Sequence, residues 1–354
     1  MEGVLMVGGV DYREKLLYPE MGKGGGCRMK ETSAGFLSGR QKKLVCVTTG
    51  NSCLGVHIVK QLLARAYLVR ITVQNQVEIE EMKEMLEEEE MNMVESVVVA
   101  KMGDLGSLCE AFSGCHAVFH TSSFIDPHGL SGYSEKMAIL EREGARNVVE
   151  ACSRAAYVKR CIFTSSLVAS IWKVNSFNSS MLIDETCWSD EDFCRQNKLW
   201  FALGKTMAEK IAWRMSRELR VNLVTLCPAL MISPSSFQCS VTHTSLPYLK
   251  GGQMMLQGGV LASVDVEKVA AAHLHVYEGM DNGASGRYLC FDRVVKRVSE
   301  AIEIENRLKI HGVLWRGRPV DDDEEELQTN LTNSKLLKLL LQSSLSSSCK
   351  QQAE

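Results

Sequence analysis

Lys43-Leu-Val-Cys-Val-Thr-Thr-Gly-Asn-Ser-Cys-Leu-Gly55 is the stretch that decides the fold. It begins with an apolar run, turns through small residues and continues into an amphipathic segment that reaches Ala66. A second apolar run, Leu68-Val-Arg-Ile-Thr-Val73, follows at once. A strand, a helix and a strand in this order predict two parallel strands joined by a right-handed crossover.

The same alternation continues through most of the chain. Further apolar runs lie at 96–100, 117–120, 161–164, 221–227 and 287–291, and helical patterns lie at about 134–155, 199–219, 243–257 and 266–280. Strands that alternate with helices in this way are typical of a parallel sheet covered on both faces. We therefore predict an α/β protein, a Rossmann-type doubly wound parallel sheet with a smaller C-terminal substrate lobe.

Composition marks the boundaries of this unit. Residues 1–42 hold a cluster of glycines among charges without lasting periodicity, which predicts a flexible N-terminal extension. The dinucleotide-binding domain is predicted over 43–228 and the substrate lobe over 229–320, interleaved with it. Residues 321–354 are acidic and then serine-rich, so we expect a largely disordered tail in which 336–341 form one or two helical turns.

Charge and cysteine usage exclude several classes of function. The net charge is -3 and no basic patch alternates with aromatic residues, so nucleic acid is not an expected partner. The thirteen cysteines are scattered without zinc-ligand spacing, which predicts reduced thiols and no metal site. The chain has no apolar run long enough to span a membrane and no secretory signal at its start, so we expect a cytoplasmic protein.

The turn after the first strand is a candidate nucleotide site. Small residues there let the backbone bring amide groups at a helix N-terminus close to a pyrophosphate. Of the three positions at which a dinucleotide-binding turn has glycine, Gly55 keeps it, whereas Thr49 and Ser52 replace it. These substitutes are small, so they predict reduced affinity rather than a blocked site. An ordinary strand–turn–helix connection without a ligand is the alternative.

The run from Lys198 to Lys210, Lys-Leu-Trp-Phe-Ala-Leu-Gly-Lys-Thr-Met-Ala-Glu-Lys, resembles the active-site helix of the extended short-chain dehydrogenase/reductases, which include the NAD-dependent epimerase/dehydratase type. Plant cinnamoyl-CoA reductases and dihydroflavonol reductases are the most similar branches. These families have Tyr-x-x-x-Lys, and this chain has Phe201 four residues before Lys205. The resemblance extends from about Lys43 to Arg297.

Phe201 bears directly on catalysis. Hydride transfer to a carbonyl leaves an alkoxide that a general acid must protonate. Positions i and i+4 share a helix face, so Phe201 lies beside Lys205 but has no proton to give. Loss of a positioned acid typically costs about 10²- to 10⁴-fold in rate. Two hypotheses follow: a weakened reductase that uses Lys205, Ser166 or a water, or an inactive dinucleotide-binding protein that acts as a sensor or partner.

The resemblance implies roles for individual residues. Ser166, in Cys161-Ile-Phe-Thr-Ser-Ser166, takes the position that holds the substrate oxygen, and Lys205 contacts the nicotinamide ribose. The implied cofactor contacts are Thr49, Gly50, Cys53, Leu54, Gly55, Arg70, Asp104, Leu105, Thr121, Ser122, Lys205, Pro228 and Met231. Most follow strand ends, where open sheets bind ligands.

The choice between NADP and NAD stays open in the sequence. The basic residues that face the 2′-phosphate in NADP-preferring members fall on Gln74 and Glu81, and neither neutralises a phosphate. An NAD-using enzyme normally offers a carboxylate at this strand end, for which Gln74 is a neutral substitute. The acidic run 78–90 is predicted to form a solvated surface helix.

The implied activity is NAD(P)H-dependent reduction of a phenylpropanoid-type CoA thioester or carbonyl. Cinnamoyl-CoA reductases read Lys-Asn-Trp-Tyr-Cys-Tyr-Gly-Lys at the active-site helix, whereas this chain has Leu199, Phe201, Ala202 and Leu203 at the intervening positions. Every lost group is polar or polarisable, so the substrate side should be more apolar. A small-molecule substrate is the expected partner, and the protein is expected to be a monomer or a homodimer.

Overall fold

The computed structural model describes residues 43–121, 123, 133–173, 182–232, 245–317 and 327–351, with side chains described as far as 342. The predicted extension 1–42, the predicted contact Ser122 and the acidic run at 321–326 lie outside these residues. Among the described residues, no helix is long and apolar enough to cross a membrane.

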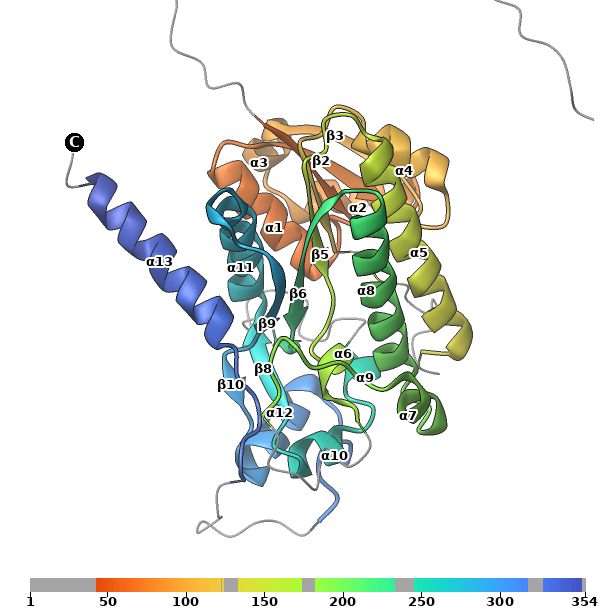
Figure 1. Ribbon diagram of the computed structural model, residues 1–354, viewed down its shortest axis with the longest axis vertical. Helices are drawn as coiled ribbons and strands as arrows, with labels where there is room; N and C mark the ends of the chain where they lie inside the picture. Colours follow the sequence, from red (N-terminus) through yellow and green to blue (C-terminus); the bar gives the residue numbers. More distant parts are fainter. Residues whose placement is uncertain are drawn as a thin grey trace, which may run out of the picture. The chain divides into compact units, whose positions relative to one another are not determined.

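The central sheet is parallel throughout, which confirms the predicted doubly wound architecture. Its strand order is β3-β2-β1-β4-β5-β6-β9 (Figure 1). The strands are β1 Leu44–Thr48, β2 Leu68–Val73, β3 Val94–Val99, β4 Ala117–His120, β5 Arg160–Thr164, β6 Asn222–Pro228 and β9 Gly286–Cys290. The order reverses between β1 and β4, so their carboxyl ends form the switch point where such sheets bind ligands.

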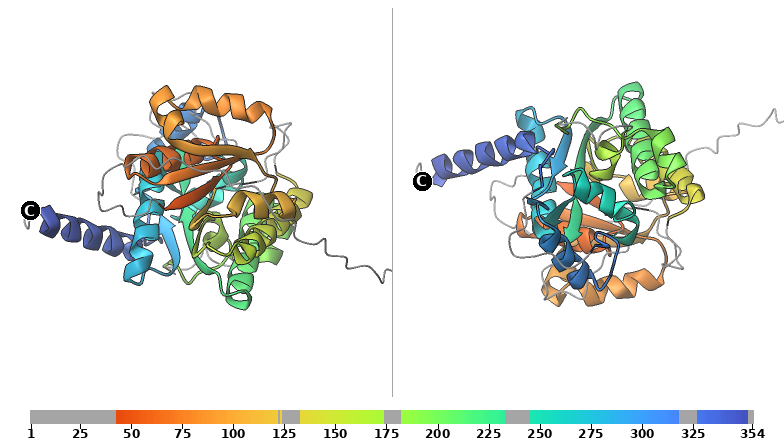
Figure 2. Two further views of the ribbon diagram at one scale, coloured as in Figure 1. Left: turned by 90° about the horizontal axis from the view of Figure 1, so that it is seen from above. Right: turned by 90° about the horizontal axis from the view of Figure 1, so that it is seen from below.

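Helices cover both faces of this sheet. On one face α1 (Cys53–Ala64) packs beside α11 (Val266–Gly279), and on the other α4 (Leu105–Phe112), α5 (Glu135–Arg154) and α8 (Trp200–Glu218) lie side by side (Figures 1 and 2). Two clusters of buried apolar side chains fill the layers between sheet and helices. Because both faces are covered, the central strands are almost continuously apolar rather than alternating.

The acidic run forms two helices, α2 (Val77–Met85) and α3 (Glu88–Met93), instead of the single predicted one. Leu86 and Glu87 are extended and separate them. The Glu87 backbone N–H donates to the Glu90 carboxylate at 3.0 Å, which begins the second helix with a capping box. Met82 is fully buried, so it anchors this acidic surface to the core.

A smaller three-stranded sheet has the order β10-β8-β7, and its strands lie before and after β9 in the chain. It comprises β7 (Leu230–Ile232), β8 (Ala262–Asp265) and β10 (Arg293–Val294). The remaining described helices, apart from α13, are α6 (Val168–Ile171), α7 (Glu191–Gln196), α9 (Ser245–Tyr248), α10 (Gly252–Gln257), η2 (Met280–Asn282) and α12 (Val298–Leu308).

The pattern predicted one helix over 243–257, but α9 and α10 are separate. Gly251 has φ 84° between them, in the left-handed region that glycine tolerates. A Cβ at this position would meet the ring of Trp172 at 2.6 Å, so close packing also requires glycine.

The tail prediction needs correction, because α13 spans Ser334–Gln351 and is longer than one or two turns. The Lys335 ammonium donates to the carbonyls of Ser285 and Arg287 at 2.7 and 2.8 Å, which fastens the start of the helix beside β9. Leu336 is buried, and the helix contacts α11 and β9. The contacts with α11 and β9 bury part of the helix and stabilise it, which the composition of the tail alone did not indicate.

Candidate functional site

The turn after β1 is held against the end of β2. Thr49 has φ 48°, a left-handed conformation that is costly for a threonine, at a position where the turn of the related reductases has glycine. Its N–H donates to Oγ1 of Thr72 at 3.2 Å, and the Gly50 N–H donates to the Thr72 carbonyl at 3.1 Å. These bonds keep the turn tight although the glycine is lost.

Helix α1 begins directly against this turn. A Cβ on Gly55 would lie 2.6 Å from the Thr49 carbonyl oxygen and 2.8 Å from the Gly50 Cα, so only glycine allows this approach. Ser52 accepts a hydrogen bond from the Gly55 N–H at 3.0 Å and caps the helix. The substitution at Ser52 therefore preserves the helix start.

These residues fit a dinucleotide. The helix N-terminus that begins at Cys53 and Leu54 faces the turn, and such a terminus favours a pyrophosphate. Asn51 Oδ1 is buried in the turn and has no hydrogen-bond partner among the described residues, which leaves an acceptor for a ligand hydroxyl.

Neighbouring strand ends supply the other predicted contacts. Asp104 is exposed after β3 and caps α4 by accepting from the Gly106 N–H at 3.0 Å, and Leu105 is half-buried beside it. Thr121 follows β4 and is fixed to β1, because its N–H donates to Thr48 Oγ1 at 3.1 Å. The structure therefore brings these residues to the same edge of the sheet as the turn.

The end of β6 adjoins the predicted substrate-oxygen position. The Ser166 hydroxyl is buried and donates to the Pro228 carbonyl at 3.5 Å. The same carbonyl accepts from the Leu167 N–H at 2.8 Å, which joins the ends of β5 and β6. Met231, half-buried in β7, follows shortly after.

Lys205 lies inside the protein and is paired with Glu141 of α5. The Nζ to Oε1 distance is 2.6 Å, and 5% and 3% of the two side chains are exposed. Glu141 also accepts from the Tyr133 hydroxyl at 2.9 Å and from the Ser123 hydroxyl at 3.3 Å. A buried lysine and a buried carboxylate each need such a partner to stay charged.

Close packing of α5 and α8 makes this pair possible. A Cβ on Gly204 would lie 3.1 Å from the Cα of Ala138 and 3.2 Å from the ring of Tyr133. Glycine at this position lets α8 approach α5, and the next residue along α8 is Lys205. The lack of a side chain at Gly204 is therefore as important for the site geometry as the lysine itself.

Phe201 lies on the same side of α8 as Lys205. Its ring packs edge-on against Tyr133, with the centroids 5.3 Å apart, and the Lys205 Nζ is 5.8 Å from the Phe201 centroid. Phe201 is buried, so its ring occupies the space beside the ammonium without offering a proton. The hydroxyl of Tyr133 is the phenol nearest in the network, and it is bonded to Glu141 rather than to Lys205.

The electrostatics keep both neighbours of the pair uncharged. Burial, reinforced by the Glu141 carboxylate, raises the pKa of Tyr133 well above its ordinary value. Burial, with a smaller contribution from Lys205, lowers the pKa of His120 to about 3, so this imidazole is neutral at physiological pH. His120 bonds through Nδ1 to Thr48 Oγ1 at 3.1 Å. The pair therefore carries the charge of this region.

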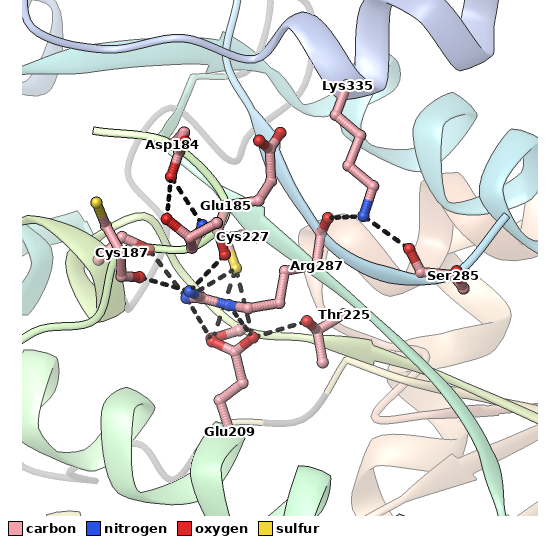
Figure 3. Close-up of polar contacts among 12 residues, drawn as sticks. Asp184, Glu185, Cys187, Glu209, Thr225, Cys227, Ser285, Arg287 and Lys335 are labelled. Carbon is pink, nitrogen blue, oxygen red and sulfur yellow. Dashed lines mark hydrogen bonds and ion pairs between the residues drawn. The ribbon is translucent and has the colours of Figure 1, made fainter. Parts of the chain in front are cut away.

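A second buried ion pair lies one helical turn along α8 (Figure 3). Arg287 of β9 binds both carboxylate oxygens of Glu209, at 2.7 and 3.1 Å. The same guanidinium donates to the carbonyls of Glu185 and Cys187 and lies 3.8 Å above the ring of Trp188. Arg287 therefore anchors the loop around Trp188 to β9.

This second pair also supports the strand that carries Ser166. The Ser165 hydroxyl donates to Glu209 at 2.7 Å, and Thr225 of β6 donates to the same carboxylate at 2.7 Å. Glu209 therefore fixes the ends of β5 and β6 relative to α8. Its role is to hold Lys205 and Ser166 in one arrangement.

Comparison with known proteins decides the family. Residues 46–284 match the 3-beta hydroxysteroid dehydrogenase/isomerase family. The chain belongs to this family. Over 275 residues it is 38% identical to cinnamoyl-CoA reductase 1 of Petunia hybrida, covering 74% of this chain and 76% of the relative. It is 30% identical over 263 residues to the bifunctional dihydroflavonol 4-reductase/flavanone 4-reductase of Malus domestica, covering 71% and 72%.

Solved structures share the fold of this reductase family. Vestitone reductase from alfalfa superposes with a TM-score of 0.60 at 24% identity, covering 84% of this chain and 92% of that one. Yeast methylglyoxal/isovaleraldehyde reductase Gre2, solved with NADPH, gives a TM-score of 0.65 at 22% identity with the same coverages. The resemblance to extended short-chain reductases is confirmed, and the chain has the fold and sequence of an NAD(P)H-dependent reductase.

One predicted contact of this reductase is not brought to the site. Arg70 points to the flank of the sheet, where its guanidinium binds both oxygens of Glu95 at 3.0 and 2.9 Å. It also donates to the carbonyls of Ala111 and Ser113 at the end of α4. The guanidinium of Arg70 thus binds a carboxylate and a helix C-terminus, and it does not point toward the expected nucleotide position.

Sequence reasoning missed Glu141 and Tyr133. Glu141 belongs to the stretch 134–155, whose helical pattern indicated only a surface-facing and a core-facing side, and Tyr133 immediately precedes that stretch. Glu141 falls on the buried face of that helix, which was the one available signal: a charged residue among buried apolar positions needs a partner. The sequence did not indicate that the partner is Lys205.

Proposed function

We propose that this protein reduces a phenylpropanoid-type CoA thioester, or a related carbonyl compound, with NAD(P)H. The observation that carries the proposal is the buried ammonium of Lys205 on α8, which lies 2.6 Å from the carboxylate of Glu141 on α5. A cation is costly to bury. Its retention beside Phe201, together with Ser166 at the neighbouring strand end, supports a working site.

The residues suggest a division of labour. The turn from Thr49 to Gly55 and the N-terminus of α1 would hold the pyrophosphate, and Asp104 would face the adenosine end. Lys205 would donate to the nicotinamide ribose. When bound, NAD(P)H supplies the hydride that adds to the substrate carbonyl carbon. Ser166 would donate a hydrogen bond to the carbonyl oxygen and stabilise the developing negative charge.

With a ketone or aldehyde, hydride addition leaves an alkoxide; with a thioester, the C–S bond then breaks to give an aldehyde and the CoA thiolate. The proton that the alkoxide or the thiolate takes up would come from the Lys205 ammonium, directly or through a water that it holds. Phe201 has no exchangeable proton. The raised pKa of Tyr133 keeps the proton on its phenol, which already donates to Glu141. The ammonium group of Lys205 has three N–H donors, and its contact with Glu141 uses one of them.

A second candidate function is an inactive dinucleotide-binding protein that acts as a sensor or partner. Phe201 favours it, because a missing general acid typically costs about 10²- to 10⁴-fold in rate. The relatives add no support, since those compared above are named as reductases. We therefore place the weakened reductase first.

Fluorescence titration with NADH and NADPH, followed by a turnover assay with cinnamoyl-CoA-type thioesters, tests the proposal. We expect binding of at least one nucleotide and slow turnover that Lys205→Met abolishes. Binding without turnover by the parent protein would contradict the reductase proposal and support the sensor. Failure to bind either nucleotide would contradict both functions.

The setting of the reaction is also a proposal. The ten cysteines whose side chains the structure describes are all free thiols, which supports the cytoplasm as the location. A monomer or a homodimer is the proposed assembly, and a small molecule is the proposed partner.

A further inference from the structure

The carboxyl end of β2 lies against the turn after β1. Gln74 is the first residue after this strand, and its side-chain amide donates to Thr49 Oγ1 at 3.5 Å. Thr72, two residues earlier, accepts hydrogen bonds from the backbone N–H groups of Thr49 and Gly50 in the turn. Whatever follows Gln74 therefore borders the place where the adenosine ribose of a bound dinucleotide lies in a doubly wound sheet.

A carboxylate is fixed at this place. Glu78, in the first turn of α2, folds back so that Oε2 accepts from the Gln74 backbone N–H at 2.8 Å. Its Oε1 accepts from the Asn75 side-chain amide at 2.8 Å. Asn75 in turn accepts from the Val77 and Glu78 backbone amides, so the loop and the carboxylate form one unit. Glu78 is half-buried, so its carboxylate has a more defined position than that of a fully exposed side chain.

The lysine and arginine side chains of α1, β2 and α2 form ion pairs with other residues. Arg70 binds Glu95 at 2.9 Å, Lys60 binds Glu90 at 2.9 Å, and Lys83 binds Glu80 at 3.0 Å. Lys101, beyond β3, is exposed, so solvent and salt screen its charge.

The two forms of the cofactor meet this carboxylate differently. A ribose 2′-hydroxyl is a donor, and a carboxylate is a good acceptor for it. A 2′-phosphate brings about two negative charges next to a fixed anion, and it has no hydrogen to donate in its ionised form. The alignment with NADP-preferring relatives pointed to Gln74 and Glu81, whereas the structure places the decisive charge at Glu78.

We propose that Glu78 makes this protein select NADH over NADPH, by accepting a hydrogen bond from the adenosine ribose and repelling a 2′-phosphate. The proposal rests on the proposed function only in requiring that a dinucleotide binds. It adds the choice of cofactor and the residue that determines it.

Equilibrium binding measures the selection without turnover. Dissociation constants for NADH and NADPH are obtained by fluorescence titration of the full chain, with competition by 5′-AMP and adenosine 2′,5′-bisphosphate as a second readout. We expect the parent to bind NADH at least about tenfold more tightly than NADPH. Glu78→Gln keeps the side chain's length and can still accept from Gln74, and it should reduce the ratio to within about threefold.

Glu80→Gln is the matched control, because it removes one charge from an exposed position of the same helix. It should leave the ratio unchanged. Circular dichroism confirms that each variant is folded.

Equal or tighter binding of NADPH by the parent would overturn the proposal, as would a Glu78→Gln variant that keeps the full preference. In both cases, measurable reduction of the substrate by the parent protein would still support the proposed reductase function. Failure to bind either nucleotide would overturn this proposal and the proposed function together.

Discussion

The Lys205 ammonium and the Glu141 carboxylate form a buried ion pair with a 2.6 Å contact between α8 and α5. Each charge is stable in the interior because of the other, and Tyr133 and Ser123 satisfy the remaining carboxylate oxygen. The relationship explains how the family's lysine stays charged beside an apolar Phe201. A substitution of Lys205 therefore also leaves the Glu141 carboxylate of α5 buried without its counter-ion.

Glu141→Gln should destabilise the protein by about 3–5 kcal/mol, because it leaves the buried Lys205 cation without a counter-ion. The double variant Glu141→Gln with Lys205→Met removes both charges and should recover most of that loss. Urea denaturation of the parent, the two single variants and the double variant gives the coupling. Additive effects would show that the two charges are independent, contrary to the geometry.

Phe201→Tyr should raise reductase turnover by at least about tenfold, because it restores a phenol beside Lys205. Steady-state kinetics with a cinnamoyl-CoA-type thioester checks it. Phe193→Tyr is the matched control, since it adds the same hydroxyl on α7, where the ring stacks on Trp172. No gain from the first change would indicate that the surroundings of the site are remodelled beyond this residue.

Thr49→Gly should tighten nucleotide binding by at least about threefold. Glycine adopts the observed φ of 48° without strain and lets a pyrophosphate approach the backbone. Arg220→Gly is the control, because Arg220 has a similar φ of 56° just after α8 and is remote from the turn in sequence. Both changes should alter stability by no more than about 1 kcal/mol. Equal effects on affinity would contradict a role for the turn.

Arg287→Met should cost about 3–5 kcal/mol in unfolding free energy, because Glu209 would remain buried without its partner. Lys83→Ala removes an exposed pair with Glu80 and should change stability by no more than about 1 kcal/mol. Thermal or urea denaturation distinguishes them. Similar small losses for both would mean that the buried network of Figure 3 does not hold the fold together.

Acid should destabilise the protein through two buried histidines. Burial lowers the pKa of His120 to about 3 and that of His273 to about 4, from an ordinary value of 6.5. The unfolded chain therefore binds more protons than the folded one as pH falls below 6.5, so stability decreases in that window. At about pH 5 each histidine should account for about 2 kcal/mol of loss relative to neutral pH.

Urea denaturation across this range measures the slope. His273→Gln should flatten it, whatever its effect on stability at neutral pH, because it removes one titrating group. An unchanged slope would show that His273 does not contribute the linked proton.

Sequence alone determined the fold class, because strand, turn and helix alternate with periods that only a covered parallel sheet satisfies. It also predicted Ser166 and Lys205 as site residues, since contiguous motifs carry those positions. Helix α13 could be predicted only in part, since its docking by Lys335 depends on carbonyls of a strand about fifty residues earlier.

Tertiary structure alone decided what surrounds those motifs. Glu141 meets Lys205 across a helix interface sixty-four positions apart in the chain, and Glu209 meets Arg287 seventy-eight apart. Arg70 was turned away from the nucleotide by Glu95 on the neighbouring strand. The local sequence pattern shows which face of a helix or strand a residue lies on. The partner of a buried charge depends on how elements distant in the sequence pack together.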